Sequence, residues 1–231
     1  MTNNKILYLS PGCFDKGGIS RYNRYQINAL REIVGVNNVK AFSLLAPQEG
    51  GFEDHFEVSW HAWGISKFSK LTFILKVLWT VAIWKPKLIW IGHVNLTEIL
   101  VRFKLFSKAK SVLNVYGLEV WSGLRPKVEE GFRNVDYVIS DCHFTANYIE
   151  SQGLRKEKST EVIWDCVDLE KFTPLKNKDS DEFYKSYNLP NPLEQPWILS
   201  LGRLSFAAAH KGYERLIEVF SKVIRSANDS L

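Results

Sequence analysis

Short apolar runs alternate along the chain with longer segments in which apolar residues recur at helical spacing. Strands are predicted at residues 5–10, 39–46, 56–60, 88–92, 111–116, 137–140 and 162–164. Helices are predicted at residues 19–34, 68–84, 97–106, 128–133 and 144–151. This alternation predicts an α/β fold, a Rossmann-like parallel sheet with helices on both faces. Ligands of such sheets bind beyond the carboxyl ends of the strands.

The pattern changes after residue 165, where prolines and charges replace the periodic apolar positions. We interpret residues 1–170 as one domain, residues 171–195 as a linker and residues 196–231 as the start of a second domain. The last segment predicts one strand at 197–201 and one amphipathic helix at 212–224. One strand and one helix cannot bury a core, so we expect the second domain to be incomplete.

Composition narrows the class of protein. Hydrophobic residues make up 45% of the chain and charged residues 24%, as is usual for a soluble globular protein. The three cysteines form no CxxC motif and the five histidines are scattered, so we expect no disulfide framework, no metal site and a cytoplasmic location. The run 71–84 is interrupted by Lys76 and is shorter than the ~20 residues of a spanning helix.

The positive charge is concentrated in one segment. Residues 61–111 hold nine Lys or Arg and one acid, Glu98, although the net charge of the whole chain is only +5. Such a segment suits the surface of an anionic membrane, where the protein would bind peripherally at the inner face. The candidate cations are Lys67, Lys70, Lys76, Arg102, Lys104 and Lys108. A solvated, lysine-rich face is the alternative, and nucleic acid is disfavoured because no nucleic-acid motif accompanies the charge.

Two loops have the composition of a phosphate site. Gly17 and Gly18 precede a predicted helix, whose first amide groups could approach a phosphate closely. Arg203 and Lys211 bracket a loop between the predicted strand and helix of the second domain. A tight turn and two solvated cations are the respective alternatives. The glycine spacing is not GxGxxG, which disfavours a dinucleotide cofactor.

Five motifs in order resemble the retaining, nucleotide-sugar-dependent glycosyltransferases of family four, which have the GT-B architecture of two facing Rossmann-like domains. The motifs are GGISR at 17–21, ISDCHFTA at 139–146, VIWDCVDLEKFTP at 162–174, LGRL at 201–204 and KGYERLIEVF at 211–220. The resemblance covers nearly the whole chain. It departs from the family at Asp165 and Cys166, where Asn-Gly is usual.

The resemblance also implies roles for residues. Arg203 and Lys211 would bind the donor diphosphate, with Gly17 and Gly18 contributing amide groups. Three candidate catalytic residues would lie on the acceptor side: His93, Tyr116 and Glu119. Tyr116 stands where the family often has histidine, and tyrosine is a poor base near neutral pH. A capping histidine and a solvated loop acid are the alternatives for His93 and Glu119.

The resemblance implies transfer of a hexose from a nucleotide-diphosphate sugar to a hydroxyl acceptor, such as a lipid-linked sugar or a polysaccharide precursor. No cofactor is expected, because the nucleotide sugar is a substrate. The paired glutamates that the family places later in the donor domain are absent, so we expect the 231-residue chain alone to be inactive. A non-catalytic half-protein that binds an acceptor, a membrane or a partner is one alternative, and a nucleotide-sugar epimerase is another.

Overall fold

The chain forms two compact units in a computed structural model, residues 1–167 and residues 168–231. The structure describes residues 4–47, 56–104, 107–155, 160–173, 184–191, 195, 197–202 and 211–228.

In the described part of unit 1, seven parallel strands form one sheet in the order β3-β2-β1-β4-β5-β6-β7. The strands are β1 (Ile6–Ser10), β2 (Val39–Ser43), β3 (Trp60–His61), β4 (Leu88–Ile91), β5 (Lys110–Val115), β6 (Tyr137–Ser140) and β7 (Thr160–Val162). The strand order reverses direction beside β1, which pairs with β2 on one side and with β4 on the other. This is the switch point at which the loops of an open parallel sheet diverge and leave room for a ligand.

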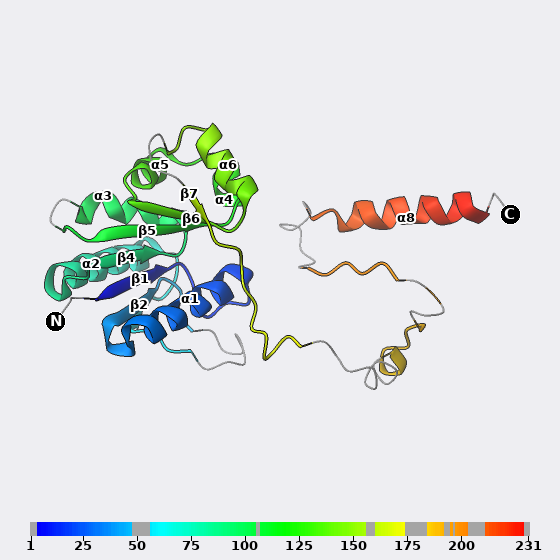
Figure 1. Cartoon of the computed structure of the whole chain (residues 1–231), viewed down its shortest axis with the longest axis horizontal. Coiled ribbons are helices and arrows are strands. Elements are labelled where there is room, and N and C mark those ends of the chain that lie inside the picture. Colours follow the sequence, from blue (N-terminus) through cyan, green and yellow to red (C-terminus); the bar gives the residue numbers. More distant parts are fainter. Residues whose placement is uncertain are drawn as a thin grey trace. The chain divides into compact units, whose positions relative to one another are not determined.

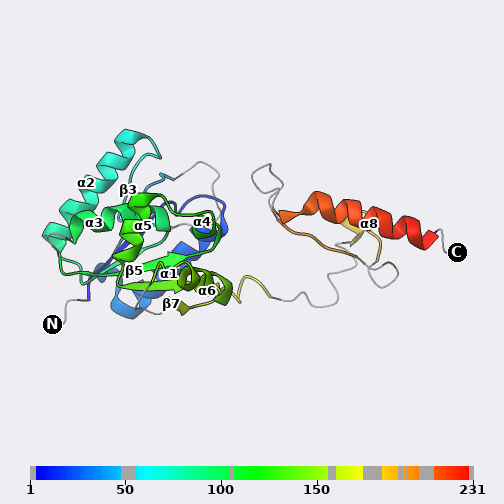
Figure 2. The ribbon, with the colours of Figure 1, turned by 90° about the horizontal axis from the view of Figure 1, so that it is seen from above.

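Helices cover both faces of this sheet (Figures 1 and 2), and the predicted fold class is confirmed. The helical elements of unit 1 are α1 (Gly18–Val34), η1 (Val36–Asn38), α2 (Lys67–Trp84), η2 (Val94–Ile99), α3 (Leu100–Phe103), α4 (Leu118–Trp121), α5 (Pro126–Arg133) and α6 (His143–Ser151). Alternate residues of β1 serve the two faces, because side chains of a strand point alternately up and down. Tyr8 packs in a cluster with Ile27 of α1, whereas Leu7 belongs to the cluster that contains Val77 of α2.

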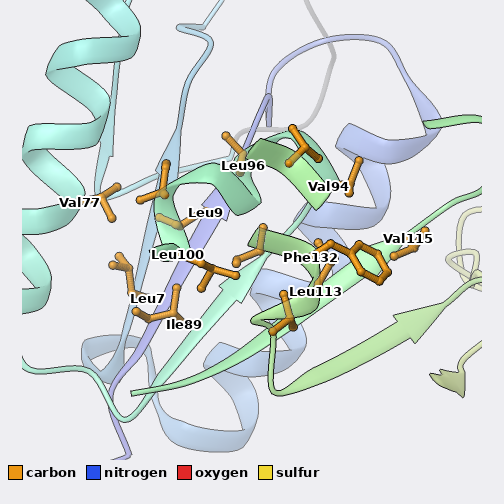
Figure 3. Close-up of a cluster of buried hydrophobic side chains, with 14 of the residues drawn as sticks. Leu7, Leu9, Val77, Ile89, Val94, Leu96, Leu100, Leu113, Val115 and Phe132 are labelled. Atoms are coloured by element: carbon orange, nitrogen blue, oxygen red, sulfur yellow. The ribbon is translucent and has the colours of Figure 1, made fainter. Parts of the chain in front are cut away.

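The larger of these clusters joins α2, η2, α3, α5 and α6 to the sheet. Figure 3 shows its centre, where Ile89 and Leu113 of the sheet approach Leu100 and Phe132 of the covering helices. All four side chains are fully buried. Burial of apolar surface on this scale is the main force that holds the strands and helices of unit 1 together.

Several predicted boundaries are corrected. β3 begins only at Trp60, because the Ser59 hydroxyl, rather than a backbone group, accepts the hydrogen bond from the Ala41 amide. The helix predicted at 97–106 is a 3-10 helix, η2, followed by the single turn of α3. In η2 the Thr97 hydroxyl lies 2.8 Å from the carbonyl of Val94, a side-chain bond that competes with regular helix. β7 spans Thr160–Val162 rather than 162–164.

Unit 2 contains the amphipathic helix α8 (Tyr213–Asn228) near the predicted position. Described residues 197–201 form no strand, which corrects the prediction for this segment. A parallel strand needs a hydrogen-bonded neighbour, and the described residues of unit 2 provide none. The apolar side chains of α8 remain partly or largely exposed, including Ile217 and Val219.

Candidate functional site

A cavity of about 470 Å³ opens at the carboxyl edge of the sheet, beside the switch point. Its wall comes from the loops that follow β1, β2 and β4, from η2 and from the amino-terminal parts of α1 and α2. The lining residues include Gly12, Asp15, Ser20, Lys70, His93, Asn95, Glu98 and Arg125. The cavity is thus lined by both charges and apolar groups such as Phe73 and Ile74, a combination typical of small-molecule sites.

The glycine loop leads into α1 at one wall of this cavity. Gly17 is the N-cap residue and makes no side-chain capping bond, and no acid lies in the first turn of α1. A Cβ atom added at Gly18 would meet no other described part of the chain within 4 Å outside its own helix, so the start of the helix has open space beside it. Neither Gly17 nor Gly18 is among the described residues that line the cavity. The Asp15 carboxylate accepts a hydrogen bond of 2.6 Å from the Ser20 hydroxyl. An anion bound here must therefore avoid the Asp15 side of the helix terminus.

His93 lies at the end of β4 and lines the cavity. It caps η2, since its Nδ1 atom accepts a hydrogen bond of 3.2 Å from the Asn95 amide. Burial lowers the pKa of His93, and the negative charge of Glu119 acts in the opposite direction. In the neutral ring the proton therefore resides on Nε2, which makes this nitrogen a hydrogen-bond donor. His93 therefore caps η2, as one alternative predicted, and also lies in the cavity wall.

Tyr116 and Glu119 form a tight turn after β5. The Glu119 carboxylate accepts a hydrogen bond of 2.5 Å from the Tyr116 amide, across Gly117 with its φ of 121°. The Tyr116 hydroxyl lies 3.0 Å from Oδ1 of Asn23, inside the protein. Burial raises the pKa of the Tyr116 hydroxyl far above its ordinary value. Unlike His93, neither side chain is among the described residues that line the cavity.

A polar network that was not predicted from the sequence joins α1 to the sheet. The Tyr8 hydroxyl lies 2.9 Å from Oδ1 of Asn23 and 2.6 Å from Oε1 of Gln26, and Nδ2 of Asn23 donates to the Ser10 hydroxyl at 2.8 Å. Asn114 of β5 donates to Gln26. The network therefore fixes α1, β1 and β5 relative to one another. In the sequence, the network is indicated only by Asn114, a polar residue within the apolar run of β5.

The two remaining predicted binding residues, Arg203 and Lys211, belong to unit 2. Arg203 is outside the described residues. Lys211 is described and exposed in unit 2, just before α8. An ion pair that was not predicted from the sequence joins Arg125 to Glu98 at 3.1 Å, and both residues line the cavity.

The predicted membrane-surface cations lie in different surroundings. Lys67 and Lys70 are exposed on α2, and Lys76 of the same helix is half-buried. Arg102 and Lys108 are exposed. Lys104 is instead engaged, because its ammonium group lies 3.3 Å from the Asp136 carboxylate and donates to the carbonyl of Asn134.

The structure is similar to several solved glycosyltransferases, whereas no protein-family model and no curated protein sequence matches the chain. HepE of Anabaena, solved with UDP, has a TM-score of 0.58 at 14% identity, with 80% of this chain and 50% of HepE covered. Sucrose-phosphate synthase of Thermosynechococcus elongatus has a TM-score of 0.58 at 15% identity, covering 80% of this chain and 53% of the synthase.

A third similar structure is the lipopolysaccharide outer core galactosyltransferase WaaB, with a TM-score of 0.50 at 13% identity, covering 76% of this chain and 50% of WaaB. The chain therefore has a glycosyltransferase fold of the GT-B kind and spans about half the length of these structures. At such low identity the similarity concerns the fold.

Proposed function

We propose that this chain is the acceptor-side part of a retaining, family-four glycosyltransferase that transfers a hexose from a nucleoside-diphosphate sugar to a hydroxyl group. The observation that carries the proposal is the cavity at the carboxyl edge of the sheet, with His93 in its wall and the open start of α1 beside it. HepE has been solved with UDP and with UDP-glucose. UDP-sugars are accordingly the donors to test first.

The proposed acceptor site is the cavity itself. With Nδ1 of His93 engaged by the Asn95 amide, Nε2 can donate a hydrogen bond to an acceptor hydroxyl. Glu119 and Tyr116 act as positioning residues, Glu119 through its charge near His93 and its bond to the Tyr116 amide, and Tyr116 through its bond to Asn23. For Glu119 and Tyr116 we therefore propose positioning roles in place of the catalytic roles that the resemblance implies.

The proposed donor site uses positive charge and amide groups. Lys211 and Arg203 would bind the diphosphate, and the first amides of α1 would add their partial positive charge. These groups stabilise the charge that develops on the departing diphosphate, which is the largest contribution in many transferases. Because the chain spans about half the length of the similar structures, the proposal includes further residues that complete this site.

A donor assay tests whether the 231-residue chain needs further residues to use a donor. Incubation of the 231-residue chain with UDP-glucose and a panel of saccharides should release no UDP above a protein-free control. A protein that carries a complete second domain should release UDP, and its Lys211→Ala variant should need about tenfold more donor, as expected for loss of one charge-assisted hydrogen bond. Release of UDP by the 231-residue chain at a comparable rate would contradict the proposed half-site.

An acceptor titration tests the cavity independently of the donor. Saccharides that show saturation-transfer signals with the 231-residue chain should bind about three- to tenfold more weakly to His93→Ala, because one hydrogen bond is lost. His143→Ala is the matched control, since the ring of His143 contacts Trp164 and does not line the cavity. If the two variants lost saccharide affinity equally, His93 would not belong to the proposed acceptor site.

A further inference from the structure

Helix α2 is apolar on two opposite sides. Its inner side carries Phe73, Val77 and Val81, which are buried in the larger core cluster; Val77 is labelled in Figure 3. Its other side carries five large apolar residues whose exposed fractions lie between 52% and 68%. These five residues form what we call the α2 outer face: Phe68, Leu71, Leu75, Trp79 and Ile83.

The spacing of these residues places them in one stripe. They follow one another at intervals of three or four residues, which corresponds to one side of an α-helix. A helix that is apolar all round is normally buried on all sides. Large contiguous apolar surface on a water-soluble domain marks a place where another body binds.

The charged residues of α2 are all positive. Lys67, Lys70 and Lys76 lie on α2, and its 18 residues include no acid. The Lys76 ammonium lies 4.8 Å from the centre of the Trp79 ring, so a cation sits directly at the apolar stripe. The loop before α2 extends the apolar surface with Trp63 and Ile65, exposed to 66% and 70%.

We propose that the α2 outer face docks the protein on the surface of an anionic phospholipid bilayer. A bilayer can bind both parts of this surface, because its acyl chains accept the apolar stripe and its anionic headgroups attract the lysines. A second copy bound through the same face would bring lysines against lysines, which disfavours self-association there. In the described ranges, no helix is both long and apolar enough to cross a bilayer.

The loop before α2 contributes to both surfaces. Ile65 lines the cavity, and Trp63 and Ile65 are exposed just before α2. A protein docked through α2 and this loop would therefore hold this part of the cavity rim near the headgroups. The docking does not depend on the proposed transferase activity, since it requires only the exposed side chains of unit 1.

Vesicle flotation with the 231-residue chain tests the proposal. The protein should float with phosphatidylcholine vesicles that contain phosphatidylglycerol, and binding should fall sharply on pure phosphatidylcholine or in ~1 M salt, where charges are screened. Lys67→Gln with Lys76→Gln should weaken binding about fivefold for each lysine. Failure of the unmodified chain to float with anionic vesicles at low salt would overturn the proposal.

A double variant tests the apolar stripe. Leu75→Glu with Trp79→Glu should lower vesicle partitioning by more than about tenfold, because two apolar side chains no longer enter the interface. Ile33→Glu with Val36→Glu is the matched control: these residues are 77% and 67% exposed outside α2, and the charge changes equally. It should bind like the unmodified chain, and circular dichroism should show that both variants are folded.

Two further outcomes would overturn docking on a bilayer. One is equal flotation of the Leu75→Glu, Trp79→Glu variant and the unmodified chain. The other is a dimer in light scattering that this variant converts to a monomer, because a second copy would then cover the α2 outer face. Loss of vesicle binding by this variant alone, with both proteins monomeric, supports the proposal.

Discussion

At the scale of single residues, Asp136 illustrates how one carboxylate joins neighbouring strands. It precedes β6 and accepts hydrogen bonds from the amide and hydroxyl of Ser111 in β5, at 2.9 and 2.8 Å. The ammonium groups of Lys104 and Lys110 lie within 3.3 Å of its oxygens. Burial alone would raise the pKa of Asp136, but the hydrogen bonds from Ser111 and the two lysines outweigh it and lower the pKa to about 2.

A pH dependence of stability follows. The folded pKa is below the unfolded value, so Asp136 stabilises the fold fully above about pH 4, and this contribution is lost as the pH falls towards 2. Asp136→Asn should cost about 1 kcal/mol at pH 7, allowing for solvent screening, and less at pH 3. Urea unfolding at both pH values measures this difference. Glu150→Gln, on the exposed surface of α6, is the control, and an equal cost of Asp136→Asn at both pH values would contradict the assignment.

Single residues of the site were only partly predictable. The position of His93 at the end of an apolar run indicated a place at the edge of the sheet, and the structure puts it in the cavity wall. Tyr116 follows a strand in the same way, yet its hydroxyl points to Asn23 of α1. That difference depends on a partner 93 positions away in the sequence, which no local pattern reveals.

At the scale of elements, a close approach between η2 and α5 fixes the cover of the sheet. A Cβ atom added at Gly131 of α5 would lie 2.3 Å from the carbonyl oxygen of Thr97 in η2. The Thr97 hydroxyl also lies 2.9 Å from the carbonyl of Val128, so backbone and side chain both hold the contact. Only glycine lets these two elements approach so closely.

Gly131→Ala should therefore destabilise unit 1 although alanine favours helix. The contact is with backbone atoms, which cannot rotate away, so we expect a cost of about 1–3 kcal/mol in the free energy of unfolding. Chemical denaturation followed by circular dichroism measures it. Gly18→Ala is the control, because its added methyl group meets no atom within 4 Å. A Gly131→Ala protein as stable as the control would show that η2 and α5 can separate at little cost.

Elements in which apolar residues recur regularly were predicted well. Elements whose form depends on hydrogen bonds to other parts of the chain were not. β6 lies where the sequence indicates it, and α1 and α2 each begin one residue earlier than predicted. The 3-10 helix η2 was missed because the Thr97 hydroxyl bonds to carbonyl groups, that of Val94 within η2 and that of Val128 in α5. The short helix α4 was missed because its four residues are too few for a periodic signal.

At the scale of the whole molecule, the two units differ in how much apolar surface they bury. The central strands β1, β4 and β5 of unit 1 contain fully buried residues such as Leu7, Ile89 and Leu113. In α8 of unit 2, by contrast, Ile217 and Val223 are more than half exposed. Because burial limits local opening, the two units should differ in backbone dynamics.

Amide hydrogen exchange measures this difference. Amides of β1, β4 and β5 should exchange at rates set by global unfolding of unit 1, whereas those of α8 should exchange orders of magnitude faster through local opening. Peptides from β3, a two-residue strand at the edge of the same sheet, provide an internal reference of intermediate protection. Protection of α8 equal to that of β4 would mean that its exposed stripe is covered in solution.

The overall α/β class followed from the sequence because it depends on alternation, which is local. The shape of the cavity did not, because its side chains come from three strand ends, from η2 and from the amino-terminal parts of two helices. The strand predicted at 197–201 failed for a related reason, since a strand exists only with a partner to bond to.

The cavity wall has a consequence for how such a protein can change over time. Every described residue that lines it lies between Pro11 and Arg125, within unit 1, whereas Lys211 belongs to unit 2. Substitutions that reshape the cavity can therefore accumulate without altering the segment that carries Lys211. Recombination between genes near codon 168 would transfer all the described lining residues of the cavity together.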